Sequence, residues 1–122
     1  MSNNLLIFIG EGIQFDLEST VSAIKKIDGV TDLVEREGPG AIFECTYKKN
    51  GDSTILRLSK DLLDISIDRV DELSLSLVLS LQEVIDQPLS VVDTGYSFHI
   101  NLEGIKSFQD LQSRIENFEF EE

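Results

Sequence analysis

The sequence predicts one α+β domain over residues 1–122, with a mostly antiparallel sheet and two to three helices packed on one of its faces. Three observations indicate this fold class. The chain has 122 residues, 41% of them hydrophobic, enough for one core without disulfides or a structural metal. Apolar residues recur with a period of two in several segments and near 3.6 in others. Asn50-Gly51 marks a tight hairpin, because both central positions of such a turn need positive φ.

The first predicted elements are a buried strand and a helix. Leu5–Ile9 is a short apolar run that Gly10 and Gly12 end, as in a buried strand. Asp16 can cap a helix with an apolar stripe at spacings of four and three. The stripe consists of Leu17, Val21, Ile24 and Ile27. Gly29 suits the position just after the C-terminal end of this helix.

A meander of strands follows, because the period of apolar residues changes to two. We expect strands over residues 31–37, 41–47 and 54–58, with a turn at 38–40 between the first two. A further strand is predicted where three apolar residues alternate with polar ones, namely Leu63, Ile65 and Ile67. The alternation implies a sheet that is polar on one face.

Residues 71–87 fit two patterns. Alternate leucines from Leu73 to Leu81 are typical of a strand, whereas Leu73, Leu77, Leu81 and Val84 make a helical stripe. A stretch of this length without a turn signal is long for a strand. Asp71 can cap a helix and Pro88 can stop one, so we expect a helix here.

The sequence of the C-terminal part predicts a second hairpin and a last helix. Strands are expected over 89–93 and 96–102, with a turn at 94–95. Ser107 opens the helix, with Asp110 in the capping-box position. Residues 118–122 form an acidic tail or a strand edge. The element order is β-α-β-β-β-β-α-β-β-α, which also permits two βαββ halves beginning at Leu5 and Leu62.

Charge limits the classes of partner. Ten basic and 23 acidic residues give a net charge of −13. Residues 61–122 hold 14 acidic and 3 basic residues, whereas residues 1–60 are nearly balanced. Such a chain repels nucleic acid and anionic membranes and attracts a basic protein. The acidity also serves solubility, so both interpretations stay open.

The chain carries little sign of secretion or membrane insertion. Cys45 is the only cysteine, so an intramolecular disulfide is impossible. The N-terminus has no basic segment before its short apolar run, and no apolar stretch approaches the roughly 18 residues of a spanning helix. We expect a cytoplasmic protein.

Catalytic, metal and cofactor motifs are incomplete. Cys45, His99 and Asp93 have the residue types of a cysteine hydrolase, but strand phase places Cys45 in the core and His99 on a polar face. Paired carboxylates remain conceivable as a glycosidase site, with nothing to select a pair. The acidic residues do not match an EF-hand, and the Gly10–Gly12 turn lacks the third glycine of a dinucleotide loop. We expect no enzyme activity, no cofactor and no metal.

The candidate contacts for a basic partner are the densest acidic run and the C-terminal tail. They are Asp61, Asp64, Asp68, Asp71, Glu72, Glu119, Glu121 and Glu122. In its small size, acidity, mixed α+β pattern and lack of motifs, the chain resembles bacterial toxin-neutralising immunity proteins. The resemblance implies a non-catalytic inhibitor that blocks the cationic site of a basic toxin or nuclease.

Two other functions stay open. The first is a small-molecule-binding or enzymatic domain, with a pocket near His99 lined also by Ser97 and Asn101. The second is a homo-oligomeric accessory domain that pairs through an exposed sheet edge or an apolar patch. The sequence leaves the oligomeric state open.

Overall fold

The computed structural model describes residues 4–10, 12–35, 41–95 and 97–118. Within them lie three helices and one seven-stranded antiparallel sheet, in the predicted order, which confirms the α+β class. The strands are β1 (Leu5–Phe8), β2 (Val30–Glu35), β3 (Ala41–Lys49), β4 (Asp52–Ser59), β5 (Ile65–Ile67), β6 (Ser90–Asp93) and β7 (His99–Asn101). The helices are α1 (Leu17–Lys25), α2 (Glu72–Val84) and α3 (Phe108–Glu116).

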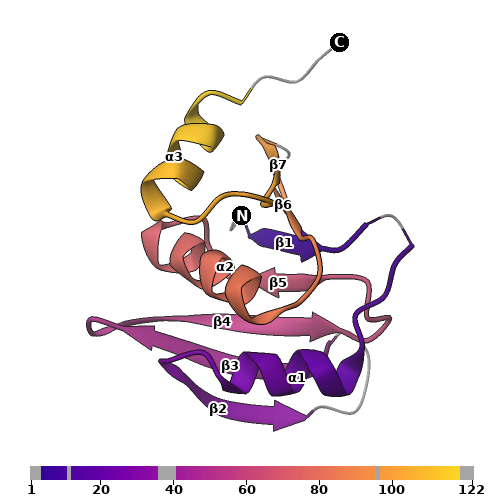
Figure 1. The fold of residues 1–122 in the computed structure, drawn as a ribbon. Helices are drawn as coiled ribbons and strands as arrows, with labels where there is room; N and C mark the ends of the chain where they lie inside the picture. Colours follow the sequence, from indigo (N-terminus) through magenta and orange to yellow (C-terminus); the bar gives the residue numbers. More distant parts are fainter. Residues whose placement is uncertain (1–3, 11, 36–40, 96, 119–122) are drawn as a thin grey trace.

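The helices cover one face of the sheet, with α2 in contact with both α1 and α3 (Figure 1). The sheet has the order β2-β3-β4-β5-β1-β6-β7 and coils around α2. The first strand of the chain is therefore central: Leu6 lies opposite Ser66 of β5 on one side and Val92 of β6 on the other. Because β1 lies between β5 and β6, the strands do not divide into two separate βαββ halves.

The core lies between the helices and the alternate strand residues that face them. Buried residues of the sheet are Leu5, Ile7, Phe43, Cys45, Tyr47, Leu56, Leu58, Ile65, Ile67, Val91 and Ile100. The helices contribute Ile24, Leu77, Leu81 and Leu111, all fully buried. The other sheet face carries half-buried and polar side chains, as the alternation predicts.

Helix α2 settles the ambiguity of residues 71–87. The amide of Ser74 donates a hydrogen bond of 2.9 Å to Asp71 Oδ1, so Asp71 is the N-cap. The helix ends at Val84, and its C-cap, Ile85, has an extended backbone three residues before Pro88. Leu75 is buried as well as Leu73 and Leu77, because α1, α3 and the sheet surround the helix. That burial explains why the apolar pattern is broader than one helical stripe.

The prediction for Gly29 was wrong. Helix α1 ends at Lys25 and its C-cap is Lys26, so Gly29 lies beyond the position expected of a helix-terminating glycine. Its φ of 97° and its closeness to β3 explain the residue instead: a Cβ there would lie 2.4 Å from the Lys48 carbonyl oxygen. Gly29 therefore lets the chain turn from α1 into β2 against β3.

Several observed strands differ in length from the predicted ones. The strand expected over residues 31–37 corresponds to β2 (Val30–Glu35). Residues 36 and 37 of the expected strand and the turn expected at 38–40 lie outside the described residues. The strand expected over 96–102 shortens to β7 (His99–Asn101). The backbone amides of Ser97 and Phe98 bind the Asp93 carboxylate and form a turn instead of continuing the ladder.

Strand β2 forms one edge of the sheet. Its register with β3 shifts between Thr31 and Val34, and Asp32 has a φ of 53°. Such a bulge twists an edge strand and hinders pairing with another chain. The bulge nevertheless leaves two apolar side chains in solvent, because Leu33 is 38% exposed and Val34 is 47% exposed.

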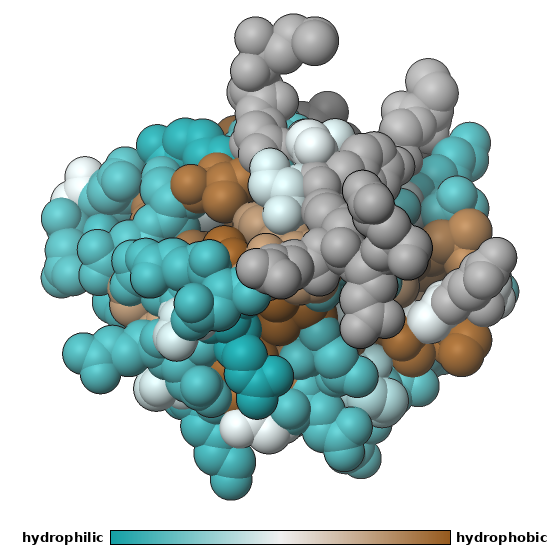
Figure 2. All heavy atoms as spheres, turned by 90° about the horizontal axis from the view of Figure 1, so that it is seen from above, coloured by the Kyte–Doolittle hydropathy of each residue, from teal (hydrophilic) through white to brown (hydrophobic). Residues whose placement is uncertain are grey.

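The described surface on the side of α3 and β7 is mostly hydrophilic, with hydrophobic side chains showing in separate patches (Figure 2). No helix in the described part of the chain has the length and apolarity needed to cross a membrane.

Replacing Leu77 with Ala should lower the free energy of unfolding by about 2–5 kcal/mol, because this fully buried side chain of α2 would leave a cavity. Leu33→Ala is the matched control and should cost less than about 1 kcal/mol, since Leu33 is partly in solvent. Urea unfolding followed by circular dichroism measures both. Equal losses would contradict the central packing of α2.

Candidate functional site

Cys45 lies on the helix-covered face of β3 and is buried. Desolvation, with a contribution from the Glu44 charge, raises the pKa of the Cys45 thiol to about 12. A nucleophilic thiol needs the opposite shift. Cys45 is therefore a core residue, in agreement with its strand phase.

The residue types of a cysteine hydrolase do not come together. His99 is exposed on the edge strand β7, with its ring centroid 5.5 Å from that of Phe8. Strands β4, β5, β1 and β6 lie between Cys45 on β3 and His99 on β7. Asp93 is buried and accepts hydrogen bonds from the amides of Ser97 (2.6 Å) and Phe98 (3.2 Å). It holds the β6–β7 turn.

The predicted acidic contacts fall into two groups at opposite ends of β5. Before the strand, Asp61 Oδ1 accepts hydrogen bonds from Ser59 Oγ (2.7 Å) and the Leu63 amide (3.1 Å). Asp64 is half-buried, and its burial and the nearby Asp61 charge raise the pKa of the Asp64 carboxyl. The Asp61 carboxylate therefore organises the β4–β5 loop, to which Asp64 contributes through its backbone.

After β5, two of the predicted carboxylates have cationic partners. Asp68 lies 2.8 Å from Arg57, which also binds Glu44 at 2.9 Å. Burial opposes the charge of Arg57, but the hydrogen bonds and charges of Asp68 and Glu44 outweigh it and raise the pKa of the guanidinium.

The start of α2 uses another of the predicted carboxylates. Asp71 caps the helix and lies 3.1 Å from Arg69 Nε. Glu72, next to it, is exposed. Glu119, Glu121 and Glu122 lie outside the described residues. The predicted acidic run is therefore divided, and its members largely serve local structure.

A different set of carboxylates meets at the C-terminal end of α2. We call it the α2 acidic end, and it consists of Asp16, Glu83, Asp86 and Glu103, all exposed. Hydrogen bonds from Ser19 lower the pKa of Asp16, which caps α1. The last turn of α2 carries no basic residue, so the partial negative charge of its carbonyls adds to that of the carboxylates.

Three hollows surround the α2 acidic end and share lining residues. A hollow of about 280 Å³ is lined by Asp16 and Asp86, one of about 390 Å³ by Asp86 and Glu103, and one of about 350 Å³ by Glu83. Among the residues that the structure describes, Lys106 is the single cation that lines them. Apolar residues complete the walls, namely Ala23, Leu79, Val84, Ile85, Pro88, Leu89 and Ile105.

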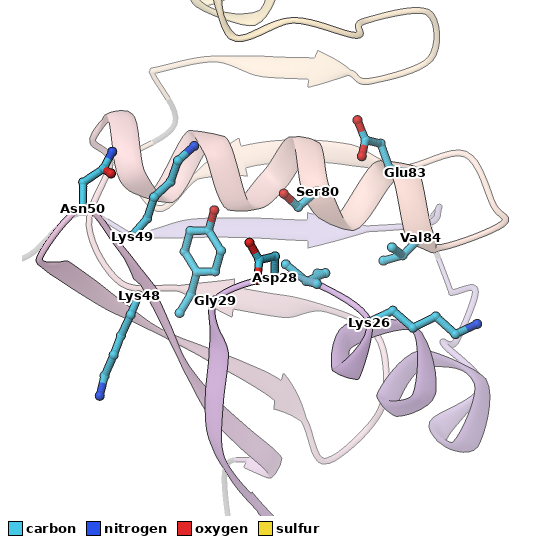
Figure 3. A pocket seen from close by; sticks show the side chains of 11 residues that line it. Lys26, Asp28, Gly29, Lys48, Lys49, Asn50, Ser80, Glu83 and Val84 are labelled. Atoms are coloured by element: carbon cyan, nitrogen blue, oxygen red, sulfur yellow. The ribbon is translucent and has the colours of Figure 1, made fainter.

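A fourth hollow, which we call the Tyr47 cleft, has the opposite balance of charge. It measures about 680 Å³ and lies between the end of α1, the β3–β4 hairpin and α2 (Figure 3). Of the described residues, three lysines contribute to its lining, Lys26, Lys48 and Lys49, against two acidic residues, Asp28 and Glu83.

The hydroxyl of Tyr47 faces this cleft. The side chain is 4% exposed, and no hydrogen bond links its hydroxyl to any residue that the structure describes. Among the described residues, Gln82 Oε1 is the side-chain polar atom that is buried from solvent and has no hydrogen-bond partner. The unbonded Tyr47 hydroxyl is not buried in this way. The Tyr47 hydroxyl is therefore open to the cleft that Tyr47 lines.

Sequence reasoning found neither of these places. The α2 acidic end combines residues from three separate segments, which only the tertiary fold brings together. For the Tyr47 cleft, the sequence contains one weak indication: Lys48 and Lys49 directly precede the Asn50-Gly51 turn. The predicted polar group around His99 stays on the edge strand, and His99 lines none of the four hollows.

Metal binding finds no support in the described residues, where no three His, Cys, Asp or Glu side chains are placed to hold an ion together. Comparison with protein-family models, with curated proteins and with solved structures gives no match. The case for function therefore depends on the geometry of the two surfaces at α2.

The Cys45 thiol should resist thiol reagents in the folded protein. At pH 8, a pKa of about 12 leaves roughly one thiol in ten thousand ionised. Reaction with a disulfide reagent should be at least roughly a hundredfold slower than in guanidinium, where the thiol is exposed. Absorbance of the released chromophore measures both rates. Similar rates would show that Cys45 is reactive in the native state.

Asp64→Asn should stabilise the protein at neutral pH, because it removes a carboxylate whose ionisation is disfavoured by folding. The gain should disappear below about pH 3.8, where Asp64 is protonated in both states. Asp61→Asn should have the opposite sign at neutral pH, because hydrogen bonds from Ser59 and Leu63 lower the pKa of Asp61. Urea unfolding at both pH values measures this. A loss for Asp64→Asn would contradict the burial argument.

Proposed function

We propose that this chain is a non-catalytic, cytoplasmic protein-binding domain whose acidic surface engages a basic partner. In its sharpest form it is an inhibitor or immunity-type protein that neutralises a basic toxin or nuclease. The observation that carries the proposal is the α2 acidic end, where acidic residues line adjoining hollows and Lys106 is the single opposing cation in the described part of the chain.

The electrostatics support this choice of surface. Asp16, Glu83, Asp86 and Glu103 are exposed, whereas Asp68 and Asp71 of the predicted run lie within 3.1 Å of arginines of the same chain. A carboxylate that already has a cationic partner offers little to another protein. Carboxylates without one attract a cationic surface over about a Debye length and speed association.

The shape of the surface supports a protein partner with long basic side chains. The hollows have apolar walls from Ile85 and Leu89 and carboxylates at Asp86 and Glu103. Lysine and arginine side chains combine an apolar stem with a charged head, so their stems fit such walls while the heads reach the carboxylates. The cationic cleft of a nuclease, built to hold phosphates, would present this kind of side chain.

The other two functions have less support. A catalytic role lacks a reactive thiol, because burial holds Cys45 in its neutral form. His99 lines none of the four hollows described above. Self-association through β2 is hindered by the bulge at Asp32 and by the repulsion between copies that each carry −13.

The test is capture of a partner from the lysate of the native host at low and high salt, with identification by mass spectrometry. A basic protein should be enriched, and salt should weaken its capture. The variant Asp86→Lys, Glu103→Lys should weaken binding of that protein by roughly tenfold or more, because it reverses two charges at the surface.

The matched control is Glu35→Lys, Glu116→Lys, which reverses two exposed charges away from the α2 acidic end. It should leave the affinity within about twofold, since both variants change the net charge equally. Equal losses would reduce the effect to net charge and contradict the proposed surface. A neutral partner whose capture is insensitive to salt would contradict the electrostatic mechanism.

A further inference from the structure

The Tyr47 cleft lies beside the proposed protein-binding surface and shares Glu83 with it. Tyr47 lines the cleft with a hydroxyl that has no hydrogen-bond partner among the described residues, although the residue itself is buried. Because the hydroxyl opens into the cleft, it can form a hydrogen bond with a molecule bound there. A polar group that opens into a hollow is typical of a small-molecule site.

The charge of the cleft favours an anion. Three of the ten basic residues of this acidic chain line it. Lys49 extends toward α2, whereas Lys48 points away from it, near Asp32 (Figure 3). Glu83 points away from Asp28 and Lys49 in the same view. Lys49 is therefore the cation best placed to contact a ligand. Of the two acidic residues that line the cleft, Glu83 repels a bound anion less than Asp28 does.

Because salt screens distant charges, the charges that line the cleft decide which ligands it attracts. Charges separated by more than about 8 Å interact weakly at physiological ionic strength. The many carboxylates elsewhere on the chain therefore add little at the cleft. Lys49 extends across the cleft toward α2 and acts there at short range.

The remaining polar groups accept or donate hydrogen bonds. Asp28 lies between Gly29 and α2, and Ser80 faces it from the helix (Figure 3). A carboxylate beside an anion site binds hydroxyl groups well, because it accepts strong hydrogen bonds from them. The volume of about 680 Å³ is in the usual range for small-molecule sites.

We propose that the Tyr47 cleft binds a small hydroxylated anion of the sugar-phosphate or hydroxy-acid type. Its anionic group contacts the Lys49 ammonium, and its hydroxyl groups contact Tyr47 and Asp28. The ligand binds between the β3–β4 hairpin and α2, on the other side of Glu83 from the hollows of the protein-binding surface.

The test is titration of the labelled protein with four probes, followed by amide shifts in two-dimensional NMR. Glucose 6-phosphate and gluconate carry both an anion and hydroxyls, glucose lacks the anion, and inorganic phosphate lacks the carbon-bound hydroxyls. At least one of the first two should shift amides of residues 26–29, 47–50 and 80–84. Glucose and phosphate should bind at least roughly tenfold more weakly.

Two variants test the contacts. Lys49→Gln should weaken binding roughly tenfold through loss of a charge-assisted hydrogen bond. Tyr47→Phe should weaken it about threefold to tenfold, because the ring that packs in the core stays and only the hydroxyl is lost. Lys60→Gln, an exposed lysine outside the cleft, is the control and should bind like the parent protein.

Several outcomes would overturn the proposal. One is the absence of cleft shifts with every probe at about 10 mM, which excludes even millimolar affinity. Another is equal binding of glucose or of phosphate, which would remove the role of the anion or of the hydroxyls. Unchanged affinity in both Lys49→Gln and Tyr47→Phe would place the ligand elsewhere. Asp86→Lys, Glu103→Lys leaves the cleft lining intact, so failure here is separable from failure of the protein-binding proposal.

Discussion

The burial of α2 is the interaction on which the rest of the structure depends. Leu77, Val78 and Leu81 are fully buried, and the helix contacts α1, α3 and β4. Side chains of α2 also line each of the four hollows described. The Tyr47 cleft and the α2 acidic end therefore keep their shapes only while α2 stays seated. Any loss of core packing under the helix would change both surfaces together.

The two surfaces have opposite balances of charge along one helix. The Tyr47 cleft carries Lys26, Lys48 and Lys49, whereas the neighbouring hollows carry carboxylates. Glu83 lines the cleft and one of those hollows, so it stands at the boundary. A chain with a net charge of −13 thus has a local electrostatic pattern that its net charge hides. Short screening lengths in solution let two such regions act separately.

Local patterns predicted most of the fold and little of the candidate sites. The caps at Asp16, Asp71 and Ser107 and the Asn50-Gly51 turn are local, and the structure confirms each. Gly29 was misinterpreted because its real constraint is the Lys48 carbonyl, which is distant in sequence.

The acidic run from Asp61 to Glu72 shows the same limit for the sites. Its density in sequence suggested one surface, but the short strand β5 separates its members, and Arg57 binds Asp68 from the neighbouring strand β4. Asp16, Asp86 and Glu103 are far apart in sequence, so only tertiary packing brings them together. Carboxylates that are close in sequence therefore do not form one acidic surface here, whereas carboxylates that are distant in sequence do.

The central position of β1 has a consequence for the order in which the chain can fold. Leu5–Phe8 pairs with β5 and with β6, so its second partner is complete only at Asp93. During synthesis, β1 has no partner strand until β5 is complete at Ile67, and it lacks its second partner until β6 is complete at Asp93. Closing contacts of such long sequence separation is slow, because the entropy of the loop is lost before the contacts form. The nascent chain therefore exposes the apolar strand β1 until its partners are made, and an exposed apolar strand is prone to premature association.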